Sequence, residues 1–195
     1  MQVKFRACGE YQTNCYIVDE KFIIDPGVNA TSWVIENIKN PKAILLTHGH
    51  FDHVWSVAEL KERLNIPVYI HKNDEFMLSD DIFSMGVPKA KADVLIQNDE
   101  TITIDNQEIS FKHFPGHTPG SITIEIGEFM FSGDFIFNGS IGRFDFPYSN
   151  SIDMKNSLKK FLNLKYDKVI YPGHGIDTTI KAAQANIKNY WLNMI

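Results

Sequence analysis

The first half of the chain alternates short apolar runs with amphipathic segments, which predicts strands separated by helices. Apolar runs bounded by turn residues predict strands over Val3–Ala7, Asn14–Val18, Phe22–Asp25, Ala43–Leu46 and Pro67–Ile70. The run Ala43–Leu46 is apolar throughout, as expected of a strand that is buried on both faces. Helices are expected from about Thr31 to Ile38 and after residue 53, where apolar residues recur at helical spacing at Val54, Val57, Ala58 and Leu64.

The second half of the chain predicts strands of another kind and two longer helices. Polar and apolar residues alternate over Thr101–Asp105, Ile109–Phe114 and Ser121–Ile126, which favours half-exposed antiparallel strands. Further strands are expected over Phe129–Ser132 and Lys168–Tyr171, and a helix over about Asp153–Leu162. The last helix, about Asp177–Asn193, has an inward stripe of Ile180, Ala183, Ile187, Trp191 and Met194. Because both halves combine strands with flanking helices, we expect an α+β fold with two sheets face to face and helices outside.

Composition and charge restrict the class of protein. The 195 residues suit one domain, so residues 1–195 are expected to form a single domain. With 44% hydrophobic and 22% charged residues, the chain is typical of a packed globule. A net charge of -5 argues against general binding to nucleic acid or to anionic membranes. No stretch approaches the roughly 20 apolar residues of a membrane span, and the first residues lack a signal-peptide pattern, so a cytoplasmic location is expected.

Three of the seven histidines lie within residues 48–53, in the segment Thr47-His48-Gly49-His50-Phe51-Asp52-His53. This segment lies between a predicted buried strand and a predicted helix. Alternate side chains of extended backbone point the same way, so His48 and His50 can bind one metal ion. Asp52 and His53 lie beyond the bend and can bind a second ion. Imidazole and carboxylate are ligands of zinc, iron and manganese, so these four residues are candidate metal ligands.

Three further polar residues lie at sharp turns next to predicted strands. His117 and His174 each follow a Pro-Gly pair, and Asp134 follows an apolar strand. Turns at strand ends place short polar side chains at the rim of a sheet, where loops carry function. A lone histidine in a turn is more often structural. Together with the cluster, however, these three residues complete a set of ligands for two ions.

These motifs, in this order, resemble those of the metallo-β-lactamase superfamily of hydrolases. The matching positions cover nearly the whole chain and are Asp25 before Pro26-Gly27, the cluster His48–His53, His117, Asp134 and His174. The resemblance implies a four-layer αββα sandwich with two metal ions. One ion would be bound by His48, His50, His117 and Asp134, and the other by Asp52, His53, His174 and the same Asp134. Asp25 would accept hydrogen bonds that hold the cluster loop in shape.

Within the superfamily, the chain is most similar to the short glyoxalase II-like group, the relatives of hydroxyacylglutathione hydrolase. The similarity rests on Gly139–Arg143, Asp145-Phe146-Pro147 and Asn14-Cys15-Tyr16. Two departures are Phe144, where the short group usually has threonine, and Tyr148-Ser149 in place of a Gly-Gly pair. A full glyoxalase II also has a C-terminal helical domain that binds glutathione. Only 20 residues follow Gly175 here, so we do not expect that domain.

The resemblance implies hydrolysis of a small-molecule thioester of the S-2-hydroxyacylglutathione type. The cofactors would be two divalent cations, with zinc expected and iron or manganese as alternatives. Two close cations can share a hydroxide at neutral pH, and this bridging hydroxide would attack the acyl carbonyl. Asp52 is the candidate catalytic residue, because it would orient the hydroxide and later accept its proton.

Two residues in the loop after Asp134 are candidates for substrate binding. These are Arg143 and Phe144, although pairing of Arg143 with Asp145 is an alternative role for the arginine. Two histidines outside the motifs, His71 and His113, lie in or beside predicted strands and are interpreted as structural residues, not as metal ligands.

Two other functions fit parts of the same pattern. A persulfide dioxygenase shares the fold and uses one iron held by two histidines and an aspartate, and the run Gly142–Phe146 is compatible with it. A metal-binding module without turnover is the second alternative, but a closed structural zinc site needs only four ligands. The sequence leaves the choice of metal and the oligomeric state open.

Overall fold

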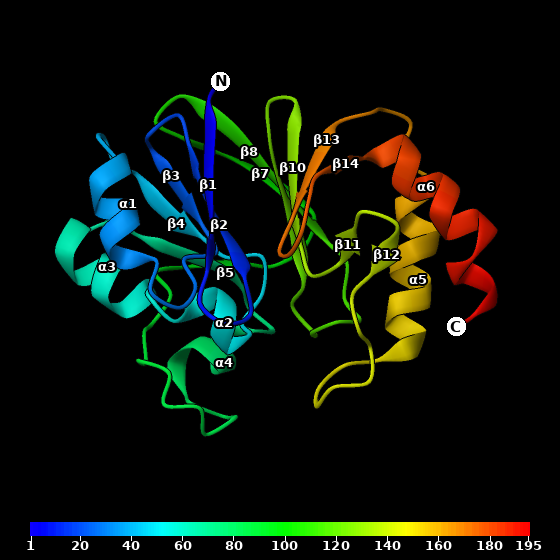
Figure 1. The fold of residues 1–195 in the computed structure, drawn as a ribbon, viewed down its shortest axis with the longest axis horizontal. Helices are drawn as coiled ribbons and strands as arrows, with labels where there is room; N and C mark the ends of the chain where they lie inside the picture. The colour runs from blue at the N-terminus through cyan, green and yellow to red at the C-terminus, as the bar shows by residue number, and fades with distance from the viewer.

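Two six-stranded β-sheets face each other at the centre of the molecule, and helices cover the outer side of each sheet (Figure 1). Helices α1 (Thr31–Asn37) and α3 (Val57–Leu64) lie against one sheet. Helices α5 (Ser151–Phe161) and α6 (Ile180–Asn189) lie against the other. The predicted α+β fold, a four-layer αββα sandwich, is therefore confirmed.

The structure is a computed structural model that describes the backbone of residues 1–195 and every side chain except that of Asn193. The first sheet has the strand order β1-β2-β3-β4-β5-β6. Its strands are β1 (Val3–Cys8), β2 (Thr13–Val18), β3 (Phe22–Ile24), β4 (Ala43–Leu45), β5 (Val68–His71) and β6 (Val94–Ile96). The first three strands are antiparallel, whereas β3 to β6 run parallel.

Parallel neighbours need crossover connections, and the helices of the first half lie in them. Helix α1 connects β3 to β4, and α2 (Phe51–Val54) together with α3 connects β4 to β5. The short helix α4 (Glu75–Ser79) lies between β5 and β6. None of the helices in residues 1–195 is long and apolar enough to cross a membrane.

The second sheet has the strand order β14-β13-β10-β9-β8-β7. Its strands are β7 (Glu100–Ile104), β8 (Gln107–His113), β9 (Ile122–Ile126), β10 (Phe129–Gly133), β13 (Val169–Pro172) and β14 (Thr178–Thr179). Strands β7 to β10 form an antiparallel meander, and β13 pairs parallel with β10. After β10 the chain leaves the sheet in a small hairpin of β11 (Ile136–Phe137) and β12 (Ser140–Ile141).

Strand β3 shows why the central strands of the first sheet are apolar throughout. Successive residues of a strand face opposite sides of its sheet. Phe22 and Ile24 belong to the hydrophobic cluster between the two sheets, which also contains Phe111 and Phe131 of the second sheet. Ile23 belongs to the cluster under α1 and α3. Both faces of β3 are therefore buried. The same is true of its neighbour β4, as its continuous apolar run predicted, because Ala43 and Leu45 belong to the cluster between the sheets and Ile44 to the cluster under the helices.

Strand β9 differs from the predicted half-exposed strand, because all five of its residues are buried. The carboxylate of Glu125 accepts a 2.7 Å hydrogen bond from the Tyr166 hydroxyl. It also forms an ion pair of 2.8 Å with Lys168. These partners offset the cost of burying the charge. The alternating pattern was misleading because residues just before β13 cover the polar face of β9.

The C-terminal helix is shorter than predicted. Strand β14 pairs with β13, and its second residue, Thr179, caps α6 by accepting a 3.2 Å hydrogen bond from the amide of Ala182. After α6 the chain continues as a 3-10 helix, η1 (Trp191–Asn193). The change of helix type ends the 3.6-residue periodicity on which the inward stripe was based. Met194 is 71% exposed, so its placement on that stripe was wrong.

The carboxyl ends of strands from both sheets meet at one edge of the sandwich. Strands β3 and β4 end there from the first sheet, and β10 and β13 end there from the second. This edge also carries α2 and the hairpin β11–β12 (Figure 1). Because parallel strands end at the same edge, the polar residues that follow them are brought together.

Candidate metal centre

The structure brings all seven predicted metal ligands to the edge where the strands end. They lie in loops or in the first turn of α2, each shortly after or between strands. The seven residues are His48, His50, Asp52, His53, His117, Asp134 and His174. They therefore come from both sheets, and only the face-to-face packing of the sheets joins them.

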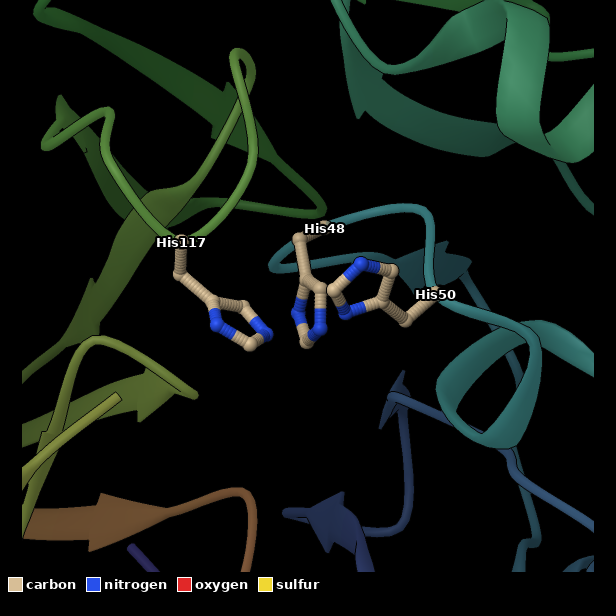
Figure 2. Close-up of side chains that lie close together, drawn as sticks. All are labelled: His48, His50 and His117. Atoms are coloured by element: carbon tan, nitrogen blue, oxygen red, sulfur yellow. The ribbon is translucent and has the colours of Figure 1, made fainter. Parts of the chain in front are cut away.

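The first group of side chains consists of His48, His50 and His117, whose ligand atoms lie within 4.8 Å of one another. Figure 2 shows the three rings pointing toward one another, two from the loop after β4 and one from the loop between β8 and β9. The ring centroid of His50 lies 4.9 Å from that of His48 and 4.5 Å from that of His117. All three are buried. Three imidazoles at this spacing form a ligand set for a divalent cation.

The second group consists of Asp52, His53 and His174, whose ligand atoms also lie within 4.8 Å of one another. Asp134 lies between the two groups. Its Oδ1 is 3.3 Å from His53 Nε2, and its Oδ2 is 3.5 Å from His117 Nε2 and 3.4 Å from His174 Nε2. Asp134 therefore contacts both groups, as a carboxylate shared by two cations must.

Hydrogen bonds orient four of the imidazole rings. In each ring Nδ1 contacts an oxygen, which directs Nε2 at the centre. The contacts of Nδ1 are from His48 to Thr47 Oγ1 (3.0 Å), His53 to Asp25 Oδ2 (3.0 Å), His117 to Arg143 O (2.7 Å) and His174 to Tyr11 O (3.0 Å). Carbonyl and carboxylate oxygens accept only, so in the neutral rings of His53, His117 and His174 the proton is on Nδ1. The lone pair of Nε2 is then free for a metal ion.

Several polar atoms at the centre have no hydrogen-bond partner among the described residues. These buried atoms are Nε2 of His48, His53 and His117 and Oδ1 of Asp134. A buried acceptor without a partner costs free energy. Divalent cations would satisfy these atoms, and nitrogen and carboxylate oxygen are the ligands that zinc, iron and manganese take. The residues present therefore fit a metal centre.

Burial and crowding keep the histidines of the first group neutral. Burial, followed by the neighbouring imidazoles of His53 and His50, lowers the pKa of His48 well below its ordinary value. Burial, followed by His117, lowers the pKa of His50 to about 3. Burial also lowers the pKa of His117. Neutral imidazoles bind a cation without first losing a proton.

The second group concentrates negative charge. Burial favours the neutral forms of Asp52 and Asp134, but the imidazole of His53 and hydrogen bonds outweigh it, and the pKa of each carboxyl is lowered. Burial likewise opposes protonation of His53, yet the two carboxylates hold its pKa well above the ordinary value. The hydrogen bonds of His174 to the same carboxylates overcome burial and raise its pKa to about 9. Ionised carboxylates are thus held where a cation would bind.

Asp25 lies behind the cluster. Its Oδ1 accepts a 2.8 Å hydrogen bond from the Thr47 amide, and its Oδ2 accepts from the Thr47 hydroxyl (2.5 Å) and from His53 Nδ1 (3.0 Å). Both oxygens are therefore committed to holding the loop and the ring of His53. The structure places Asp25 in the supporting position that the resemblance implied.

A second buried carboxylate, Asp74, was not identified from the sequence. Its Oδ2 accepts hydrogen bonds from the Gly49 amide (3.0 Å) and the Thr118 hydroxyl (2.6 Å), and its Oδ1 accepts from the Gly120 amide (2.6 Å). Burial raises the pKa of Asp74 to about 6 in spite of these bonds. Asp74 therefore ties the loop of His48 and His50 to the loop of His117. In the sequence it is one acidic residue in a segment without a motif.

Gly173 is the position where the site leaves no room for a side chain. A Cβ built at this position would overlap Asp134 Oδ1 and lie 2.7 Å from His53 Cε1. The backbone here also pairs with its neighbours, because the Gly173 amide donates a 2.8 Å hydrogen bond to Gly133 O. The glycine before His174 thus allows β13 to approach the shared carboxylate.

A cavity of about 680 Å³ opens above the two groups of ligands. His50, Asp52, His117, Asp134 and His174 lie on its floor. Its walls are largely aromatic and include Tyr11, Phe51, Phe83, Phe137 and Phe146. A small molecule in this cavity would therefore meet the candidate metal centre on one side and apolar rings on the others.

The two residues that were predicted to bind substrate, Arg143 and Phe144, have different surroundings in the structure. Arg143 lines the cavity, but its guanidinium also forms two hydrogen bonds to Asp145, of 2.9 and 2.8 Å. Phe144 packs against the hydrophobic cluster beneath α5 and α6 and is not among the residues that line the cavity, which argues against contact with a substrate there. Two residues later, Phe146 lines the cavity. The backbone bends at both phenylalanines, so the two-residue periodicity of extended chain does not hold here, and the sequence did not show which ring faced the site.

The two remaining histidines stack on each other away from the candidate ligands. The rings of His71 and His113 are 4.0 Å apart and nearly parallel. His71 Nε2 is 3.2 Å from Gln97 O, and His113 Nε2 is 2.9 Å from Pro119 O. Both rings have backbone partners and lie outside the two ligand groups, as expected of the structural role predicted for them.

Comparisons with known proteins agree with this site. A family model described as the metallo-beta-lactamase superfamily matches residues 8–174. A Haemophilus influenzae protein named hydroxyacylglutathione hydrolase GloC is 35% identical over 211 residues, which cover 99% of each chain. The crystal structure of BLEG-1 B3 metallo-beta-lactamase has a TM-score of 0.86 at 34% identity, covering 98% of this chain and 99% of that one. The structure of TTHA1623 in a di-iron-bound form has a TM-score of 0.76 at 34% identity, covering 92% and 96%.

Proposed function

The chain belongs to the metallo-beta-lactamase superfamily, and we propose that it is a dinuclear metal-dependent hydrolase that cleaves thioesters of the S-2-hydroxyacylglutathione type. The observation that carries this proposal is the position of Asp134. Its two carboxylate oxygens lie within 3.5 Å of histidines from both ligand groups, so one side chain would hold two cations side by side. Paired cations suit hydrolysis, since they support both the attacking oxygen and the carbonyl oxygen.

The residues that would hold the two ions are those of the two groups described above. His48, His50 and His117 would hold one ion, Asp52, His53 and His174 the other, and Asp134 would contact both. When bound, the ions would lower the pKa of a water molecule and polarise the carbonyl of the substrate. We propose zinc for both positions, with iron or manganese as alternatives. The di-iron-bound form of TTHA1623 supports a two-metal centre and keeps iron among the candidates.

Asp52 is the proposed catalytic residue. In hydrolysis of the thioester, the water oxygen forms a bond to the carbonyl carbon, the carbon–sulfur bond breaks and the sulfur leaves as thiolate. The reaction produces a carboxylate and a thiol, and Asp52 would accept the proton that the attacking water releases. A 2.6 Å hydrogen bond from the Thr13 hydroxyl orients Asp52 toward the centre, beside the place where the attacking water would lie.

Two features of this chain favour a thioester over other acyl substrates. One is the 35% identity to a protein named hydroxyacylglutathione hydrolase, over nearly the full length of both chains. The other is the largely aromatic wall beside the ligands, which offers apolar surface to the acyl group and to the soft leaving sulfur. A thiolate also leaves without a protonating acid, and the chain's candidate site needs no further general acid for this reaction.

The test is elemental analysis of protein purified without chelator, followed by assay of a thioester panel that includes S-lactoylglutathione. We expect two equivalents of zinc, iron or manganese and turnover of thioesters. The variant Asp52→Asn should lower kcat by about 100-fold or more. Its matched control, Asp80→Asn, changes a carboxylate that is 64% exposed and should leave kcat unchanged.

Other results would identify the alternatives. One equivalent of iron, no thioester turnover and uptake of oxygen with a persulfide would overturn the proposal in favour of a dioxygenase. Bound metal with no turnover of any thioester in the panel would favour a metal-binding module.

A further inference from the structure

Aromatic rings stand directly beside the metal-facing imidazoles. The ring centroid of Phe83 is 5.7 Å from that of His50, and the centroid of Phe146 is 6.1 Å from those of both His50 and His117. On the other side, the centroid of Phe137 is 6.1 Å from that of His174. Both ligand groups are therefore bordered by phenyl rings. A group attached to a carbonyl carbon at the centre would therefore have phenyl rings within reach.

The guanidinium of Arg143 packs on the ring of Phe146. The guanidinium carbon of Arg143 lies 4.2 Å from the centroid of this ring, and Asp145 fixes the guanidinium through two hydrogen bonds. The ring of Tyr148 connects the loop of Phe146 to the loop of Phe83, because its centroid lies 6.3 Å from that of Phe83. The aromatic wall above the first ligand group is therefore preorganised. Phe146 is nevertheless 39% exposed, so it has apolar surface to bury against a ligand.

The cavity offers little for a charged thiol carrier. Of the side chains that line it in the described structure, Arg143 is the only charged one outside the set of candidate ligands. Its charge is already compensated by Asp145. Glutathione has two carboxylates, and the cavity offers them only this one cation, which is shared with Asp145 at the protein surface. Selection by this cavity must therefore rest mainly on the apolar part of the substrate.

We propose that the cavity selects substrates by the acyl group, and that it favours 2-hydroxyacyl groups with an aromatic or branched apolar substituent over the small lactoyl group. This inference rests on the proposed thioesterase function. A phenyl substituent on carbon 2 of the acyl group would bury the exposed parts of Phe83 and Phe146, whereas the methyl of lactoyl leaves them in contact with water. The volume of about 680 Å³ is sufficient for such a substituent. The thiol carrier would extend toward solvent and contribute little to selection.

The first experiment crosses two acyl groups with two thiols. S-mandeloyl and S-lactoyl thioesters of glutathione and of N-acetylcysteamine are assayed with the metal-loaded enzyme. We expect kcat/KM to be about tenfold or more higher for mandeloyl than for lactoyl on either thiol. For a given acyl group the two thiols should differ by about threefold or less. Equal or higher activity on lactoyl, or a larger effect of the thiol than of the acyl group, would overturn the inference.

Two phenylalanine variants test the aromatic wall. Phe146→Ala should bring the ratio of kcat/KM for mandeloyl over lactoyl to within about threefold of one, because the lost ring no longer covers the phenyl group. Phe5→Ala is the matched control, since Phe5 is 59% exposed in a separate groove beside Tyr16 and Tyr171. It should leave the ratio unchanged. If both variants preserve the ratio, Phe146 does not determine specificity and the wall is wrongly assigned.

A binding measurement separates failure of this inference from failure of the proposed function. Calorimetry compares mandelate with lactate, the carboxylates that the two substrates would release. We expect the dissociation constant for mandelate to be about tenfold or more lower, and Phe146→Ala to remove the difference. If no thioester is hydrolysed but mandelate binds more tightly, the function is wrong and the selectivity of the cavity stands. If thioesters are hydrolysed without acyl preference and the two acids bind equally, the function stands and this inference fails.

Discussion

Asp74 accepts a 3.0 Å hydrogen bond from the backbone amide of Gly49, so a buried carboxylate fixes the peptide between two candidate ligands, His48 and His50. The same carboxylate accepts hydrogen bonds from Thr118 and Gly120 in the loop of the third imidazole of this group. The glycines allow this approach, because a Cβ at Gly120 would lie 2.6 Å from Asp74 Cγ. The spacing of the first ligand group thus depends on a residue that contacts none of its rings.

The variant Asp74→Asn should weaken metal binding at the first ligand group. Its amide presents one acceptor and one N–H₂ group, so at least one of the three donors would face another donor. We expect the affinity for the more weakly bound metal to fall about tenfold or more, and the free energy of unfolding of the metal-free protein to fall by about 2 kcal/mol. Competitive metal titration and urea unfolding measure the two effects.

Asp80→Asn is the control for Asp74→Asn, because it changes an exposed aspartate paired with Lys89. It should alter neither measurement. A loss of stability with unchanged metal affinity would show that Asp74 supports the fold and does not position the ligands.

Asp134→Ala should remove metal and activity together. The substitution deletes the carboxylate whose oxygens lie 3.3 to 3.5 Å from three imidazoles of both groups. We expect metal content to fall from two equivalents to one or fewer, and kcat/KM for the preferred thioester to fall by about 100-fold or more. Elemental analysis and steady-state assays check this. Glu128→Ala, in an exposed turn, is the control, and full metal content in Asp134→Ala would contradict the shared role.

Removal of metal should lower the thermal stability of the protein. When the cations leave, the buried imidazole nitrogen atoms and the clustered carboxylates lose the contacts that the cations would provide. A cation at about 100 times its dissociation constant contributes about 2.7 kcal/mol, and 1 kcal/mol corresponds to roughly 2–4 °C in a chain of this length. Chelation should therefore lower Tm by about 5 °C or more, and added zinc should restore it. Calorimetry with and without chelator measures this shift, and an unchanged Tm would argue against bound metal.

The stacked pair of His71 and His113 should make the fold less stable in weak acid. Burial, followed by the imidazole of His113, lowers the pKa of His71 from 6.5 to about 4, and Lys72 acts in the same direction. As the pH falls from 6.5 to 4, the unfolded chain therefore takes up a proton at His71 before the folded protein does. The free energy of unfolding decreases over this interval and levels off below it.

The variant His71→Phe tests this dependence, because it keeps the stacked ring and removes the titrating nitrogens. Metal-free wild type and variant are unfolded with urea at pH 7, 6, 5 and 4, so that metal release does not contribute. The slope of the unfolding free energy against pH should be smaller in the variant. Equal slopes would mean that His71 is not responsible for the acid sensitivity.

The candidate ligands could be predicted from the sequence because their information is local. His48 and His50 alternate on extended backbone, and Asp52 and His53 follow in the first helical turn, so one short segment carries candidate ligands of both groups. The turns before His117 and His174 are equally local. Residues that act through long-range contacts gave no such signal. Asp74 is separated by 44 residues from its partner Thr118, and nothing near it in the chain indicates that contact.

The burial of individual side chains is the other property that local sequence patterns did not predict correctly. Phe144 and Phe146 are both aromatic residues of one loop, and only packing against α5 and α6 assigned one to the core and the other to the cavity. The alternating pattern predicted that the face of β9 that carries Glu125 is exposed, whereas Tyr166 and Lys168 cover it in the structure. In each case the deciding neighbour comes from a distant part of the chain.

The layered α+β architecture and the candidate metal ligands could be inferred from the chain alone, because hydrophobic periodicity and ligand spacing act over a few neighbouring residues. How those residues meet depends on the packing of the whole fold. It placed Asp134 between the two ligand groups, put Asp74 behind the first group and set Phe83 and Phe146 along the cavity wall. These contacts form only when the two sheets pack face to face and bring the ends of their strands to one edge.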